Sequence, residues 1–142
     1  MTTSEQITVE TVVQAAPDEA WAAYTSPDAI VQWNQATPDW CCPSAEVDLR
    51  EGGRHNARME ARDGSMGFDL AGIYEEVDAP RALTLRLEDG RRSRTVFEPD
   101  GSGTRVTTTF DPEASNPVEM QRGGWQAILD SYRGYVDGLV GD

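Results

Sequence analysis

The sequence has little of what metal centres and disulfide scaffolds require. It holds one histidine and two cysteines in 142 residues, and Cys41 and Cys42 are adjacent. A metal site needs several such ligands at suitable spacing, so we expect no metal. A disulfide between neighbouring cysteines needs unusual backbone strain, so we expect two reduced thiols, as in the cytoplasm.

Positive charge and long apolar runs are also scarce. The chain has 12 basic residues against 25 acidic ones, a net charge of -13, which repels phosphate backbones and anionic membrane surfaces. No window approaches the ~18 apolar residues of a spanning helix, and the N-terminus lacks a basic stretch leading to an apolar run. We therefore expect a cytoplasmic protein with no nucleic-acid partner and no membrane insertion.

Catalytic and cofactor motifs are missing as well. The sequence has neither a Gly-x-Ser-x-Gly elbow nor a phosphate-binding glycine loop, and no basic residue lies near the paired thiols to lower their pKa. No cofactor is expected.

What is present is a chain of ordinary globular composition, 38% apolar and 26% charged, long enough for one domain over residues 1–142. Its most regular stretch, 119–140, has the period of an amphipathic helix. Asn116 is placed to cap it, with Pro117 at its first position. The apolar sector comprises Val118, Trp125, Ile128, Leu129, Tyr132, Tyr135, Val136, Leu139 and Val140. In the first third of the helix this sector offers only Val118, the amide of Gln121 and Trp125, with Gly124 at its edge, so that end looks under-filled.

The remainder alternates short apolar-patterned segments with turn signals. Residues 7–13 alternate as a strand, and two short helices follow, at 19–24 and from Pro27 to Trp33. Residues 34–44, with Pro38 and Pro43, are predicted as a loop. Further strands are predicted at 45–49, 54–62, 68–77, 82–88, 93–98 and 104–110, separated by glycine-containing turns. This order predicts an α+β fold in which an antiparallel meander buries one face under the last helix.

Four segments in this order carry a family resemblance: residues 15–34, 49–64, 72–85 and 119–129. Their most specific features are the proline-led helix ending in Trp33, the Gly52-Gly53 turn, and the Gly124-Trp125 pair. Together they resemble the activator of Hsp90 ATPase homologue 1-like (AHSA1-like) branch of the START/Bet v 1-like SRPBCC superfamily. The resemblance implies a helix-grip fold: a curved seven-stranded antiparallel sheet around a long C-terminal helix, with two short helices after the first strand and a cavity for apolar or amphipathic molecules.

Inward-facing positions of that sheet and helix give the candidate ligand-binding residues. They combine apolar and aromatic groups with few polar atoms, as small-molecule sites do, and small residues that leave volume. The set is Trp33, His55, Ala57, Met59, Phe68, Leu70, Gly72, Tyr74, Leu85, Gln121, Gly124 and Trp125. For most of them plain core packing is the competing interpretation.

Three functions stay open on the sequence. The leading hypothesis is a protein that binds a small apolar or amphipathic molecule. A cyclase- or dehydratase-like enzyme would use His55, the weak catalytic candidate, with Tyr74 or Gln121 to move a proton. An interaction module, with a chaperone as its partner, is the third, because the family name comes from a co-chaperone that stimulates the Hsp90 ATPase.

Overall fold

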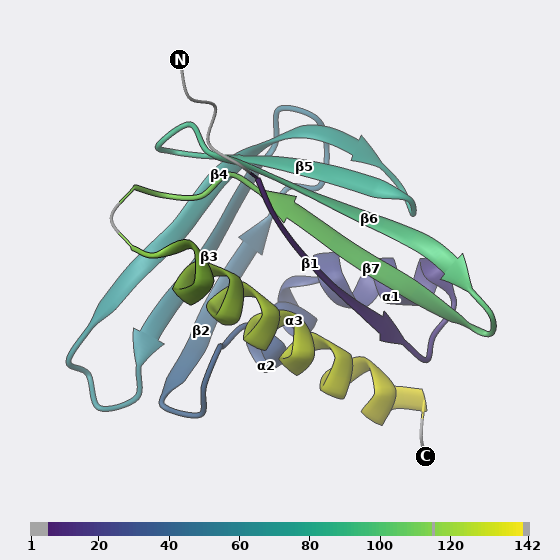
Figure 1. The fold of residues 1–142 in the computed structure, drawn as a ribbon, viewed down its shortest axis with the longest axis horizontal. Helices are drawn as coiled ribbons and strands as arrows, with labels where there is room; N and C mark the ends of the chain where they lie inside the picture. Colours follow the sequence, from purple (N-terminus) through teal and green to yellow (C-terminus); the bar gives the residue numbers. More distant parts are fainter. Residues whose placement is uncertain (1–5, 115, 141–142) are drawn as a thin grey trace.

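The computed structural model describes residues 6–114 and 116–140, with the side chains of Leu139 and Val140 outside the described part. Seven strands and three helices follow one another as the meander pattern predicts (Figure 1). In chain order they are β1 (Ile7–Val13), α1 (Pro17–Thr25), α2 (Pro27–Trp33), β2 (Trp40–Val47), β3 (Arg54–Ala61), β4 (Gly67–Asp78), β5 (Ala82–Leu87), β6 (Arg92–Asp100), β7 (Gly103–Phe110) and α3 (Val118–Val140).

The strands form one antiparallel sheet in the order β1-β7-β6-β5-β4-β3-β2. From β2 to β7 each strand pairs with its neighbour in sequence, while β1 joins at the far side of β7. The turns fall at the predicted glycines: Gly90 follows β5 and Gly101 follows β6, both at positive φ, which an L side chain rarely adopts. The sheet curls around α3 in the helix-grip arrangement, and the predicted fold class is confirmed.

Helix α3 covers only part of the sheet. It packs against β1, α1 and α2. Two hydrogen bonds attach it to β1 and the residue after it: the Gln126 side chain donates to the Glu10 carbonyl at 3.0 Å, and the backbone N–H of Gln14 donates to the Asp137 carboxylate at 2.9 Å. The half of the sheet formed by β3, β4 and β5 therefore faces the helix across a gap rather than through close packing.

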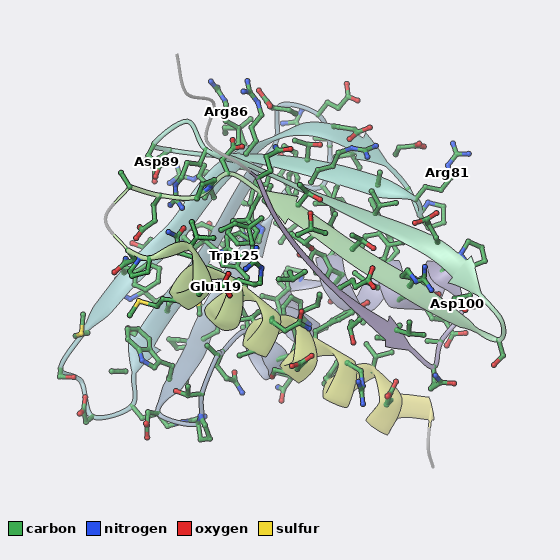
Figure 2. The ribbon with its side chains drawn as sticks, in the orientation of Figure 1. Arg81, Arg86, Asp89, Asp100, Glu119 and Trp125 are labelled. Carbon is green, nitrogen blue, oxygen red and sulfur yellow. The ribbon has the colours of Figure 1, made fainter. Side chains whose placement is uncertain are left out.

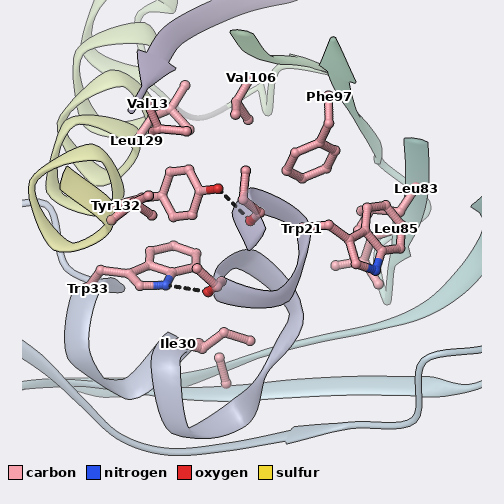
Figure 3. Packing of buried hydrophobic residues seen from close by; sticks show 14 of the residues in the cluster. Val13, Trp21, Ile30, Trp33, Leu83, Leu85, Phe97, Val106, Leu129 and Tyr132 are labelled. Carbon is pink, nitrogen blue, oxygen red and sulfur yellow. Dashed lines mark hydrogen bonds between the residues drawn. The ribbon is translucent and has the colours of Figure 1, made fainter. Parts of the chain in front are cut away.

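An aromatic cluster joins the three helices to β6 (Figure 3). The Tyr132 hydroxyl donates to the Ala20 carbonyl at 2.6 Å, and the Trp33 indole donates to the Ala23 carbonyl at 2.9 Å. Phe97 closes the cluster from β6. Burying these rings removes large apolar areas from water, and the two bonds satisfy the polar atoms buried with them.

Three local predictions were wrong. Residues 34–44 are not all loop, since β2 begins at Trp40; a register shift between Cys41 and Ser44 accommodates Pro43, which has no amide hydrogen for a regular ladder. Val118 is 44% exposed rather than inward-facing. The Asn116 side chain donates to Glu113 instead of capping the helix, and α3 begins at Val118 rather than at Pro117. The backbone N–H of Gln121 donates to the Pro117 carbonyl.

The outer face of the sheet carries paired charges. Arg92 contacts Glu75 at 2.5 Å and Arg94 contacts Glu76 at 3.0 Å, both between β6 and β4. Figure 2 shows the charged side chains Arg81, Arg86, Asp89 and Asp100 at the periphery of the sheet and its turns. No described helix combines the length and the apolar character needed to cross a membrane.

Candidate functional site

A pocket of about 220 Å³ lies where α3 does not close on the sheet. Its walls come from the inner face of β3, β4 and β5, from α2, and from the middle of α3. The lining residues are Val9, Tyr24, Ile30, Trp33, Asn34, His55, Met59, Phe68, Leu70, Tyr74, Leu83, Leu85, Leu87, Ser93, Thr108, Trp125, Ile128 and Leu129. None of these carries a carboxylate, an ammonium or a guanidinium group, so the lining is uncharged apart from what His55 can contribute.

An irregularity in β4 keeps carboxylates off this inner face. Side chains alternate between the faces of a strand, so the register that points Tyr74 inward would also point Glu76 inward. The pairing shifts between Tyr74 and Glu76, and Glu75 and Glu76 both reach arginines of β6 instead. The extra residue thereby places Glu76 outside beside Glu75 and leaves Tyr74 at the pocket.

His55 and Tyr74 form a hydrogen-bonded pair in the pocket wall. The His55 Nδ1 and the Tyr74 hydroxyl oxygen are 3.0 Å apart, with the rings edge-to-face. Burial lowers the pKa of His55 from 6.5 to about 4, so the imidazole is neutral at pH 7. Burial, with a smaller contribution from Tyr24, raises the pKa of Tyr74, which stays a phenol. The pair is therefore an uncharged donor and acceptor unit.

Further hydroxyl groups line the same pocket, and the buried hydroxyl of Thr95 connects two of them. The Tyr24 and Thr95 hydroxyl oxygens are 3.3 Å apart, and those of Thr95 and Thr108 are 2.9 Å apart, which makes a short chain of bonds. The Ser93 side chain is 7% exposed, lines the pocket, and has no hydrogen-bond partner in the described part of the chain. These polar atoms interrupt a surface that is otherwise apolar.

Aromatic rings fix the helix side of the pocket. Trp125 of α3 stacks on Phe110 at the end of β7, with ring centroids 3.9 Å apart and planes 12° from parallel. On α2, Trp33 stacks against Tyr24 at 5.3 Å and is held by its indole bond to α1. Rings packed against other rings have few alternative rotamers, so we expect this wall to be shaped before any ligand arrives.

Eight of the twelve residues predicted from the sequence line the pocket: Trp33, His55, Met59, Phe68, Leu70, Tyr74, Leu85 and Trp125. The polar residues Tyr24, Asn34, Ser93 and Thr108 were missed. Thr108 shares the inward phase of β7 with Val106 and Phe110, so the strand alternation could have identified it. Asn34 follows α2 in a segment where no periodicity exists to be used.

The other four predicted residues, Ala57, Gly72, Gln121 and Gly124, do not line the pocket. Ala57 is fully buried in the core. A Cβ at Gly72 would lie 2.5 Å from the Arg86 carbonyl, so this glycine permits close approach of β5. Gln121 donates to the Glu113 and Asn116 carbonyls and accepts from the Glu113 amide. The pocket consequently faces α3 from Trp125 to Leu129 rather than at its first two turns.

No group of three or more potential metal ligands occurs among the residues described. The Cys42 thiol is buried and contacts the Ser44 carbonyl at 3.4 Å, and burial raises its pKa. Cys41 and Cys42 are both unbridged thiols.

Comparison with known proteins places the chain in a family. The model for activator of Hsp90 ATPase homologue 1-like protein matches residues 14–137. The chain belongs to this family. The solution structure of an AHSA1-like protein from Aeromonas hydrophila is 38% identical, with a TM-score of 0.90, over 97% of this chain and 96% of that one.

Further solved structures are similar to this AHSA1-like chain over nearly its whole length. A protein from Cytophaga hutchinsonii is 41% identical with a TM-score of 0.81, over 96% of this chain and 94% of that chain. A protein from Nitrosomonas europaea, at 18% identity and a TM-score of 0.83 over the whole of both chains, shows the same fold. No curated protein has a significant match to the sequence.

Proposed function

We propose that this AHSA1-like protein binds a small apolar or amphipathic molecule in the pocket between β3–β5, α2 and α3. The observation that carries the proposal is an apolar pocket of about 220 Å³ with a few convergent polar groups. That combination is typical of small-molecule sites, which rely on apolar area for affinity and on few polar atoms for orientation.

The size of the pocket limits the ligand. An apolar cavity of about 150 Å³ holds one benzene, and pockets for drug-sized ligands begin near 300 Å³. A volume of about 220 Å³ lies between them. We therefore expect a ligand of roughly ten non-hydrogen atoms, by interpolation between those two cases.

Amide chemical shifts test the proposal. Indole, para-ethylphenol and octanol would each be titrated into isotope-labelled protein, and at least one is expected to give saturable shifts at Met59, Leu70, Leu85 and Ile128. These residues lie on three strands and on α3 around one space. Absence of saturable shifts for all three compounds at millimolar concentration would contradict the proposal.

A filled pocket provides the matched control. Leu70 lines the pocket, whereas Asp69, its neighbour on β4, is exposed and contacts Arg58 on the outer face. Leu70→Trp is expected to abolish the saturable shifts because the indole occupies the ligand's volume, and Asp69→Trp is expected to leave them. Equal binding by both variants would place the ligand elsewhere.

The cyclase-like and chaperone-linked alternatives, and the cytoplasmic location, stay predictions of the resemblance and the composition. Ligand binding is the proposal favoured here because a neutral, mainly apolar pocket supports it without requiring a reactive substrate proton near His55.

A further inference from the structure

The pocket lining disfavours charged ligands. Its residues carry no formal charge at neutral pH, and Glu75 and Glu76 of β4 are paired with Arg92 and Arg94 on the outer face. A carboxylate or ammonium brought into this space would lose its hydration without gaining an opposite charge. Desolvating an unpaired ion costs far more than desolvating a hydroxyl.

The His55–Tyr74 pair has a fixed hydrogen-bonding inventory whichever tautomer is present. A neutral imidazole has one N–H and one lone-pair nitrogen, and a phenol has one O–H and an accepting oxygen. Their mutual bond at 3.0 Å uses one donor and one acceptor. If the phenol donates to Nδ1, the pair retains the Nε2–H donor and the phenol oxygen acceptor; if Nδ1–H donates, it retains the phenol O–H and the Nε2 acceptor.

The surroundings of the pair are apolar. Leu85 is the register partner of Tyr74 on β5, and Leu87 lies across Gly72 from His55, so the leucines continue the wall on that side. The next polar group in the Tyr74 row is Ser93, the partner of Leu85 on β6. A ligand packed against Leu85 and Leu87 makes apolar contacts along its body. On this wall it meets polar atoms only at the His55–Tyr74 pair and at Ser93.

We propose that the ligand is an uncharged molecule whose hydroxyl or carbonyl group bonds to the His55–Tyr74 pair and whose apolar body lies against Leu85 and Leu87. This inference rests on the proposed ligand-binding function and names the chemical class that the site accepts. The pair accommodates either polarity, because it can present a donor to a carbonyl oxygen or an acceptor to a hydroxyl by exchanging tautomers. A fatty acid or other carboxylate is excluded by the uncharged lining.

Three probes of one shape test the inference: ethylbenzene, para-ethylphenol and para-ethylbenzoate, titrated at pH 7 with amide shifts as the readout. The phenol is expected to bind at least about a hundredfold more tightly than the carboxylate, because the charge has no partner. This comparison needs only the natural sequence. Similar affinities for the two, or tighter binding of the carboxylate, would overturn the inference while leaving ligand binding intact.

A variant then isolates the pair. Tyr74→Phe is expected to weaken para-ethylphenol about threefold to tenfold, the range for one neutral hydrogen bond, and to leave ethylbenzene unchanged. Tyr135→Phe is the control, since Tyr135 does not line the pocket. An unchanged phenol affinity in Tyr74→Phe would show that the Tyr74 hydroxyl does not bond to the ligand, and would overturn recognition by the two groups together. If none of these three probes binds but indole or octanol does, the inference fails and ligand binding stands. If no compound of either set binds, the proposed function fails as well.

Discussion

The depressed pKa of His55 makes the stability of the fold depend on pH. Burial lowers this pKa from 6.5 to about 4 in the folded protein. Between these values the unfolded chain binds a proton that the folded chain does not, so stability rises with pH through this window. The free energy of unfolding that depends on His55 is fully present above pH 6.5 and is lost as the pH falls towards 4.

The magnitude follows from the two pKa values. A difference between 6.5 and about 4 corresponds to roughly 3 kcal/mol when fully developed, at about 1.36 kcal/mol per unit. Between pH 7 and pH 5 about 2 kcal/mol of this is lost, because the folded-state group is still mostly neutral at pH 5. That is a substantial part of the 5–15 kcal/mol typical of a domain.

The test compares the natural protein with His55→Gln, in which the amide oxygen can still accept from Tyr74 but does not titrate. Urea unfolding at pH 7, 6 and 5 would give the free energy of unfolding of each. The chain has only one histidine, so subtracting the two curves removes contributions of the acidic residues and of the net charge. We expect the natural protein to lose about 2 kcal/mol more than His55→Gln between pH 7 and 5.

Two results would refute this reasoning. One is parallel curves, within about 0.5 kcal/mol, for the natural protein and His55→Gln. The other is a histidine that titrates near 6.5 in the folded protein, read directly from its ring-proton shift. Either result would mean that water reaches the imidazole well enough to stabilise its charged form.

Other perturbations of the fold have defined expectations. Tyr132→Phe should lower the free energy of unfolding by about 1 kcal/mol, because the buried hydrogen bond from its hydroxyl to the Ala20 carbonyl is lost, whereas Tyr135→Phe should change it by less than about 0.5 kcal/mol in the same urea experiment. Gly124→Ala should stabilise the protein by about 0.5–1 kcal/mol, since its Cβ would meet open space in a helix. Gly72→Ala should destabilise the protein, because its Cβ would lie 2.5 Å from a backbone oxygen. The midpoint of thermal unfolding should therefore rise for Gly124→Ala and fall for Gly72→Ala, and the opposite order would contradict both. Gln121→Ala should speed amide hydrogen exchange at the start of α3, because three bonds to the preceding segment are lost, and unchanged exchange would count against that role.

The sequence predicts most of this architecture because its elements have strong local patterns. Residues 7–13 alternate over a full strand, and Pro27 and Trp33 bound α2 as predicted. The prediction of a loop at 34–44 was wrong because this segment has no alternation of apolar and polar residues. Its second half is a strand only because it pairs with β3.

The candidate site could be predicted less completely than the fold, because a pocket forms where packed elements leave space between them. Strand phase correctly identified the inward positions of β3 and β4, including His55 and Tyr74. It could not show that the side-chain amide of Gln121 hydrogen-bonds to the segment before α3. Nor could it show that the middle of the helix, rather than its start, lines the pocket. Those facts depend on the tilt of α3 across the sheet, which no local pattern encodes.

The two edges of the sheet bear on how the protein behaves at high concentration. An open sheet offers unpaired backbone groups on its outermost strands, and these can recruit strands from other molecules. On β1, the outward carbonyl of Glu10 already accepts from Gln126, so the long helix occupies part of that edge. On β2, Pro43 and the adjoining register shift interrupt the ladder. Both margins are thus poor templates for strand addition, and intermolecular sheet extension is disfavoured without any further element covering them.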